Sequence, residues 1–224
     1  MGWFGPSEGI CSCCPPPPEG CYLTTTGATS YSSGASTFDM ALPALTATAT
    51  LVAIICQHDV LETISAPSGS GWTLISSTGA DAMGSGPVIV VYVKECVGDE
   101  GSTNTLTNIH ETPIAAIVYC VSCPVAGSGS EAFGSSSSPA CSEPSPTISS
   151  GVFQLAITTW RIDEATLSAF FTGYTGGYLT VASGSGSGDV VIAAGWKAES
   201  ATAAVSGATL SATTDWAVIV EAFE

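Results

Sequence analysis

The stretch VIVVYV, at residues 88–93, consists almost entirely of β-branched side chains. Such residues favour strands, and six residues are a typical strand length, far short of the roughly 20 that cross a membrane as a helix. A strand that is apolar at successive positions is expected to have both of its faces covered. The run therefore predicts a central strand of a sheet buried on both sides, and we expect neighbouring subunits of an oligomer to cover the outer faces.

Similar short β-rich runs recur along the chain, separated by clusters of Gly, Ser and Pro. We expect strands at about 47–57, 71–77, 87–96, 103–108, 113–122, 151–160, 178–183, 189–198, 206–212 and 214–223. The Gly/Ser-rich stretch 125–138 is predicted to be a turn region. No segment shows a sustained 3.6-residue apolar period, which a helix would require. The nearest candidate is RIDEATLSAF (161–170), which we interpret as one short helix or a loop. We detect no internal repeat of fixed period.

About ten short strands with regular turn signals predict an all-β fold, specifically a jelly-roll-like β-sandwich. The 224 residues are enough for one large all-β domain. We place the sandwich domain at residues 23–224 and a short Cys/Pro-rich N-terminal arm at residues 1–22. The inward faces of the strands should form the core, with Trp72 and Leu74 among its members.

The charge balance limits the classes of partner. Lys and Arg total 3 and Asp and Glu total 19, which gives a net charge of −16. Counterion release from a phosphate backbone needs basic side chains, so we expect no nucleic-acid partner and no binding to an anionic membrane surface. No apolar run reaches the roughly 20 residues of a membrane span, so we expect no membrane insertion. The N-terminus MGWFGPSEGI lacks a basic region followed by an apolar one, so it does not predict a signal peptide.

The stretch CSCCPPPPEGC, residues 11–21, carries the chain's densest group of potential metal ligands. Zinc or an iron–sulfur cluster is bound by thiolates of this kind, although the C-x-C-C-x₆-C spacing matches no common site. Disulfides, within one chain or between copies at a symmetry axis, fit equally well, and so does plain packing. The candidate metal ligands are Cys11, Cys13, Cys14 and Cys21.

The same arm carries the residues that we expect to anchor the protein. Pro15 and Pro16 belong to a four-proline run that favours stiff, extended polyproline II structure. Trp3 and Phe4 are bulky apolar side chains ahead of it. They either fold back onto the body of the same chain or fill a pocket on a partner subunit, as aromatic anchors do.

The sequence does not predict an enzyme. His58 and His110 lack the context and spacing of a nucleophilic triad. The glycine run SGSGSGD lacks the Lys-Ser/Thr of a phosphate-binding loop. The carboxylates are dispersed, and sequence alone does not show whether any two of them face one substrate.

The order of the motifs resembles a known family. The motifs are LVAIICQ (51–57), APSGSGWTLISS (66–77), VIVVYVKE (88–95), IAAIVYCVSCP (114–124), FQLAITTW (153–160) and VVIAAGWK (190–197). This order is similar to that of β-sandwich modules in structural proteins of tailed-phage and phage-like particles. The resemblance implies a non-enzymatic virion protein, a head decoration or spike or a tail appendage. It also implies synthesis in the host cytoplasm without a signal peptide, and display on the virion surface.

The partners follow from this reading. We expect other capsid or tail proteins, anchored through the arm, and further copies of the chain in a homo-oligomer. The alternative function is a carbohydrate-binding module for host attachment, because sugars stack on exposed aromatic side chains beside polar groups. Core packing is the competing role of such residues. The candidates for glycan binding are Trp160, Tyr174, Tyr178 and Trp196.

Overall fold

The protein is all-β in its described part. The computed structural model of the chain describes residues 28–32, 35–45, 49–58, 64–78, 86–98, 100–107, 112–122, 128–139, 152–161, 164–183, 189–199 and 207–223. These residues form fourteen strands and no helix. The predicted fold class is confirmed. The segment interpreted as a short helix or a loop instead contains a strand, at Leu167–Ala169.

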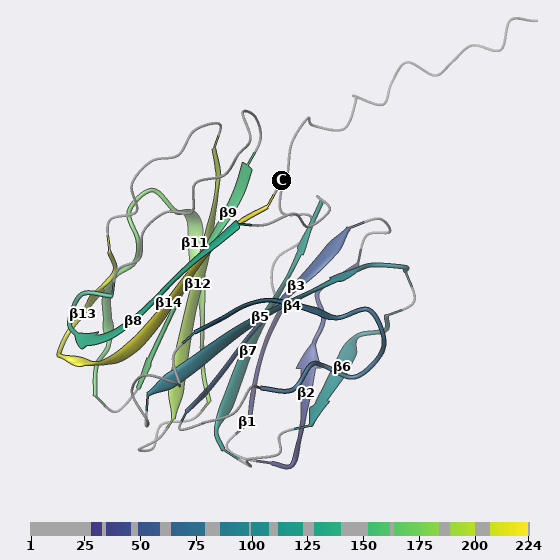
Figure 1. Cartoon of the computed structure of the whole chain (residues 1–224), viewed down its shortest axis with the longest axis horizontal. Helices are drawn as coiled ribbons and strands as arrows, with labels where there is room; N and C mark the ends of the chain where they lie inside the picture. Colours follow the sequence, from purple (N-terminus) through teal and green to yellow (C-terminus); the bar gives the residue numbers. More distant parts are fainter. Residues whose placement is uncertain are drawn as a thin grey trace, which may run out of the picture.

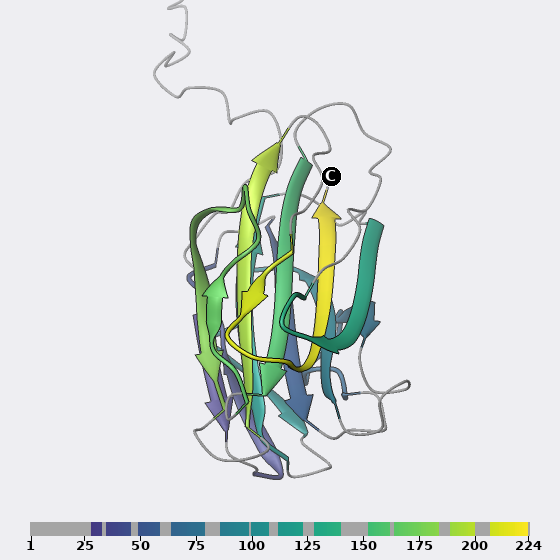
Figure 2. The ribbon, with the colours of Figure 1, turned by 90° about the vertical axis from the view of Figure 1, so that its left-hand side faces the viewer.

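Two antiparallel five-stranded sheets face each other (Figure 1). Sheet 1 runs in the order β1 (Ala28–Ser32), β7 (Ile114–Val121), β3 (Thr50–His58), β5 (Pro87–Glu95) and β4 (Thr73–Thr78). Sheet 2 runs in the order β11 (Thr175–Ala182), β12 (Val190–Glu199), β9 (Val152–Arg161), β14 (Thr214–Phe223) and β8 (Ser128–Ser136). Figure 2 faces sheet 2, with β14 in yellow beside β8 in teal.

The connectivity is not that of a jelly roll. Each sheet here is built from one half of the chain, sheet 1 from β1–β7 and sheet 2 from β8–β14. A jelly roll instead distributes the strands of its two Greek keys over both sheets. The sandwich is therefore confirmed, and the jelly-roll-like detail is wrong.

Two short ribbons lie outside the sheets. β2 (Thr37–Ala41) pairs with β6 (Thr103–Thr107), and β10 (Leu167–Ala169) pairs with β13 (Thr209–Leu210). Figure 1 shows β2 and β6 on the outer side of sheet 1, and β13 on the outer side of sheet 2. The body thus has four layers.

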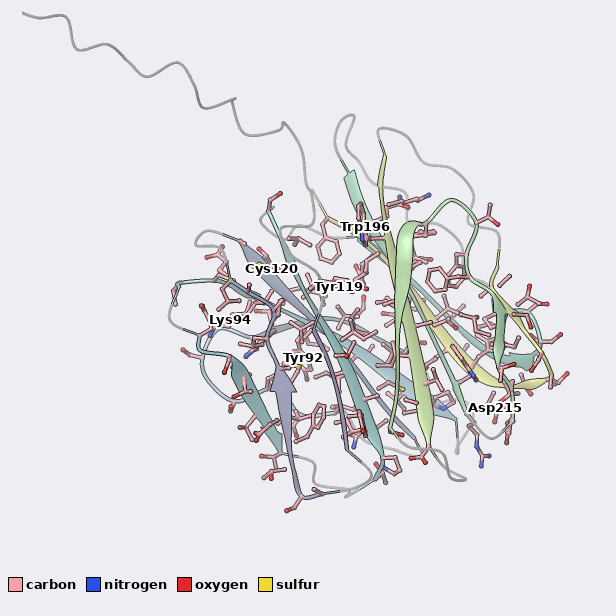
Figure 3. All side chains as sticks on the ribbon, turned by 180° about the vertical axis from the view of Figure 1, so that it is seen from behind. Tyr92, Lys94, Tyr119, Cys120, Trp196 and Asp215 are labelled. Atoms are coloured by element: carbon pink, nitrogen blue, oxygen red, sulfur yellow. The ribbon has the colours of Figure 1, made fainter. Side chains whose placement is uncertain are left out.

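The space between the sheets holds the central core. Its members come from the three middle strands of each sheet: Val52, Ile54, Cys56, Ile89, Val91, Val93, Ala115, Ile117, Tyr119, Val121, Leu155, Ile157, Val190, Ile192, Ala194, Ala217, Ile219 and Phe223. Tyr119 lies between the sheets (Figure 3), and its hydroxyl donates to the carbonyl of Ala194 at 3.0 Å. Cys56 Sγ and Thr159 Oγ1, also from opposite sheets, lie 2.8 Å apart.

Each sheet is also buried on its outer face. Phe38 and Met40 of β2, with Leu106 of β6, pack on the outward residues of β3, β5 and β7. On sheet 2, Leu210 of β13 packs in the same cluster as Trp216 and Val218 of β14. The runs of successive apolar residues are therefore covered within one chain. The expectation of an oligomer rested on these runs needing cover from neighbouring subunits. The burial within one chain removes that reason.

Each of the ten expected strands has a counterpart in the structure, and the differences concern edges and short ribbons. Strands β1 and β2 were not predicted, and β8 lies in the stretch expected to be a turn. Leu74, expected in the core, is 41% exposed, because β4 is an edge strand with a register irregularity between Leu74 and Ser76. Trp72 is partly buried against the outer core of sheet 1.

Candidate functional site

A pocket of about 660 Å³ opens where β5 ends and β3 begins. It is lined by Thr50, Ser70, Gly71, Thr73, Ile75, Val93, Lys94, Glu95 and Val97. The register places Thr50 opposite Glu95 and Thr73 opposite Val93, so these side chains share one face of sheet 1. The lining combines hydroxyl groups with apolar side chains and the carboxylate of Glu95, a composition suited to a small polar ligand.

Gly71 brings the turn close to the lysine of the pocket. Its φ is +92°, in the left-handed region that glycine adopts without strain. A Cβ at this position would meet Lys94 Cγ at 3.7 Å. Lys94 therefore lies along the turn, and its side chain is only 15% exposed.

Glu100 sets the electrostatics beside the pocket. It accepts the backbone N–H groups of Val97 at 2.6 Å and Gly98 at 3.0 Å, and its Oε1 lies 4.0 Å from Lys94 Nζ. Burial opposes ionisation of Glu100, but these N–H groups and Lys94 hold its pKa below the ordinary value. Because Glu100 stays ionised, it partly neutralises Lys94, whose side chain lies on the opposite face of β5 from Val93 and Glu95.

A second polar cluster lies between the sheets, next to this pocket along β4. Glu221 of β14 is 1% exposed, and it accepts a hydrogen bond from the hydroxyl of Ser76 on β4. Gly129 of β8 is opposite Glu221, and a Cβ there would come within 2.3 Å of the carboxylate. On the same strand, Glu131 accepts the backbone N–H of Ser77 at 3.2 Å. Carboxylates from sheet 2 thus hold β4 of sheet 1.

Glu221 titrates near neutrality. Burial raises its pKa to about 7, the nearby charge of Glu131 raises it as well, and the hydrogen bond from Ser76 lowers it. A carboxyl with this pKa has the acidity of a general acid, but a side chain so deeply buried does not meet a substrate. Its chemistry is therefore a proton-dependent contact between the sheets.

The predicted aromatic residues do not form one platform. Trp160 is 2% exposed and its Nε1 donates to the carbonyl of Ala165 at 2.9 Å, so the prediction of a sugar-stacking role for it is wrong. Trp196 is partly buried against the core between the sheets. Figure 3 labels its position. Tyr174 packs on the opposite, outer face of sheet 2. The side chain of Tyr178 lies outside the described residues.

Tyr174 is held in a cluster of its own. Its ring makes edge contacts with Phe170 and Phe171, at centroid distances of 6.3 and 6.2 Å. Lys197 Nζ lies 5.0 Å from the ring centroid, and the hydroxyl donates to Gln154 at 3.4 Å. These contacts fix the ring edgewise, and the ammonium group covers one of its faces.

The arm lies outside the described residues. This concerns Trp3, Phe4, Pro15 and Pro16, and also Cys11, Cys13, Cys14 and Cys21. Within the described part, no group of three or more His, Cys, Asp and Glu side chains is placed to bind a metal. Burial raises the pKa of the Cys56 and Cys96 thiols to about 12, so both stay protonated at neutral pH.

Sequence reasoning did not single out Glu221, although a signal for it was present. The apolar run WAVIVEAF (216–223) contains one carboxylate, that of Glu221. A charged residue in such a run is expected to be buried and paired. The pocket, in contrast, is assembled from three strands and a turn, and no spacing along the chain shows it.

Comparisons with family models, with curated proteins and with solved structures found no match for this chain. The described residues contain no helix long and apolar enough to cross a membrane.

Proposed function

We propose that the chain is a non-enzymatic structural protein of a phage or phage-like virion. It would serve as a head decoration or spike, or as a tail appendage, anchored by the arm at residues 1–22. The observation that supports this most is the four-layer body, in which the chain covers both outer sheet faces with its own ribbons. Such a body needs no partner to bury its sheets. We therefore assign attachment of the protein to the particle to a separate segment, the arm.

The charge distribution supports display in an array. Among the described cations, Lys94 lies near Glu100, and Arg161 Nη1 lies 2.8 Å from Glu164 Oε1. With a net charge of −16, the acidic field dominates, and neighbouring bodies repel one another. The particle would be assembled in the host cytoplasm and would display the protein as an anchored homo-oligomer. The repulsion between acidic bodies would keep this array soluble. The thiols of the arm, with zinc, an iron–sulfur cluster or disulfides, would join copies or fasten them to capsid or tail proteins.

The test is incorporation into particles. Antibodies against the body should label particles purified from the organism that encodes the chain. A chain lacking residues 1–22 should keep the melting temperature of the full chain but be absent from particles. A matched full-length control with Cys11, Cys13, Cys14 and Cys21 changed to Ser separates thiol chemistry from the aromatic and proline residues. Normal incorporation of the truncated chain would contradict the proposal.

The pocket supports the second candidate, glycan binding for host attachment. Hydroxyl groups beside Glu95, over apolar Val93 and Ile75, suit a saccharide ring. Val93→Trp should fill the pocket and abolish binding of host surface polysaccharide in calorimetric titration. Phe133→Ala, which removes an exposed aromatic elsewhere, should leave binding unchanged. Equal binding by the Val93→Trp variant, or no binding by the natural chain, would exclude this site.

A further inference from the structure

The two halves of the chain have nearly the same topology. Counted within β1–β7, the strands of sheet 1 follow the order first, seventh, third, fifth, fourth. Counted within β8–β14 and read from β8, those of sheet 2 follow the order first, seventh, second, fifth, fourth. In both halves the sixth strand, β6 or β13, belongs to the outer ribbon. The halves differ in where the other ribbon strand comes in the chain. β2 precedes the central strand β3, whereas β10 follows the central strand β9.

The hydrogen-bond registers coincide residue by residue. Cys56 of β3 is opposite Ile89 on one side and Ala115 on the other. Thr159 of β9 is opposite Ile192 and Ala217. Counting from these positions gives further equivalent pairs, among them Val52 and Leu155, Val93 and Trp196, Lys94 and Lys197, Tyr119 and Glu221, and Tyr31 and Phe133.

The turn into the fourth strand of each half is also the same. Gly71-Trp72-Thr73 leads into β4, and Gly173-Tyr174-Thr175 leads into β11. The φ values of the two glycines are +92° and +90°. Thr73 is opposite Val93 and Thr175 is opposite Trp196, which are themselves equivalent. An irregular register follows in both strands.

The halves are arranged as two-fold mates in space. The first strand of each half contacts the fourth strand of the other, β1 with β11 and β8 with β4. The seventh strand of each contacts the fifth of the other, β7 with β12 and β14 with β5. The equivalent residues Cys56 and Thr159 contact each other at 2.8 Å. In a two-fold arrangement, equivalent residues meet at the axis.

We propose that residues 28–122 and 128–223 are two repeats of one structural unit, and that the inner face of each is a surface built to bind a second copy of that unit. An interface of this isologous kind is self-complementary. The chain is thus an intramolecular dimer, whatever its function. The repeat escaped detection in the sequence because most equivalent positions carry different residues, as Tyr119 and Glu221 do, and because the ribbon partner precedes the central strand in one half and follows it in the other.

The same relation accounts for the pocket beside β5. Val93, which lines it, is equivalent to Trp196, whose large side chain packs into the core at that place in the second repeat. The lysine next to each residue is retained, as Lys94 and Lys197. The first repeat has therefore kept open a space that the second has filled.

An exchange across the axis tests the proposal on the full chain. Cys56→Thr combined with Thr159→Cys should leave the urea midpoint of unfolding unchanged, because Ile and Ala flank both positions in the same register. The control exchanges two residues that are not equivalent, Val52→Thr with Thr159→Val. It should lower the midpoint, because it leaves the Cys56 thiol without the Thr159 hydroxyl. A loss in the first exchange as large as in the control would overturn the two-fold relation.

A second chain tests self-complementarity directly. Residues 128–223 are replaced by another copy of residues 28–122, with the connecting segment 123–127 kept. The expected product is a folded monomer whose amide NMR spectrum shows one set of signals for the two copies. Two distinct sets of signals, or an unfolded or aggregated product, would overturn the claim that the inner face fits its own copy.

Discussion

Glu221 occupies a core position whose equivalent in the first repeat is a neutral phenol. Tyr119 joins the sheets through its hydroxyl and the carbonyl of Ala194. Burial raises the pKa of Tyr119, so this bridge stays neutral across the ordinary pH range. The second repeat has a carboxyl at that place, in contact with Ser76 and close to Glu131. Of the contacts that these two equivalent positions make across the sandwich, to β12 and to β4, only the one at Glu221 therefore responds to protons.

Stability should fall as pH rises from about 4.5 to 7. In this window the unfolded chain releases the proton of Glu221 while the folded chain keeps it, so the unfolded state binds fewer protons. The equilibrium constant of folding falls about tenfold per pH unit in this window. The free energy of unfolding therefore falls by about 3 kcal/mol over the whole window. Glu221→Gln should remove this contribution, measured as the difference in urea midpoint between pH 5.5 and pH 8. Carboxyl ¹³C NMR should show a glutamate titrating near pH 7.

The other carboxylates provide the controls. Glu95 lies further along the inward face of β5 and is exposed, so Glu95→Gln should keep the natural pH profile. Glu131→Gln removes the repulsion and should lower the pKa of Glu221, which burial nevertheless keeps above the ordinary value. An unchanged pH profile in the Glu221→Gln variant would contradict the assignment.

Strand β8 shows how composition misleads at the level of the element. SGSEAFGSS is typical of a turn, yet it pairs along its length with β14. Its glycines leave room for the larger side chains of that neighbour. A Cβ at Gly134 would lie 2.7 Å from Trp216 Cζ2, inside any normal contact distance. The Trp216 indole occupies this space, and its Nε1 donates to Ser136 at 3.0 Å.

Gly134→Ala should therefore destabilise the protein by about 1–3 kcal/mol, because the indole must shift in a packed core. Thermal unfolding followed by tryptophan fluorescence measures the effect. Ser135→Ala is the matched control on the same strand, since Ser135 is exposed. Equal melting temperatures for the two variants would show that the ring moves without cost.

At the scale of the molecule, the two repeats depend on one shared core. The inward residues of both sheets belong to a single cluster, so neither sheet buries its inner face without the other. The ribbons, in contrast, cover each outer face locally. The interface between the repeats is thus a core divided between two halves of one chain, as in an obligate dimer.

Unfolding should accordingly be one cooperative transition despite the internal repeat. The tryptophan fluorescence of the body reports Trp160, Trp196 and Trp216 in the second repeat and Trp72 in the first, and Trp3 of the arm adds to the signal. This fluorescence should change with the same urea midpoint as far-UV circular dichroism. Two separated transitions would mean that the repeats are independent domains.

The sequence by itself determined the all-β class and the central strands of the two sheets. Runs such as VIVVYV carry that information locally, through β-branched side chains and their period. The edge strand β8, the ribbon strand β2, the pocket and the partners of Glu221 were decided by tertiary structure. The Ser/Gly-rich strand β8 forms because β14 offers it a free edge and because its glycines leave space for the side chains of β14. The pKa of Glu221 is raised because strands distant in the sequence bury its carboxyl. The two-fold relation likewise resides in register and contact, which are preserved where residue identity is not.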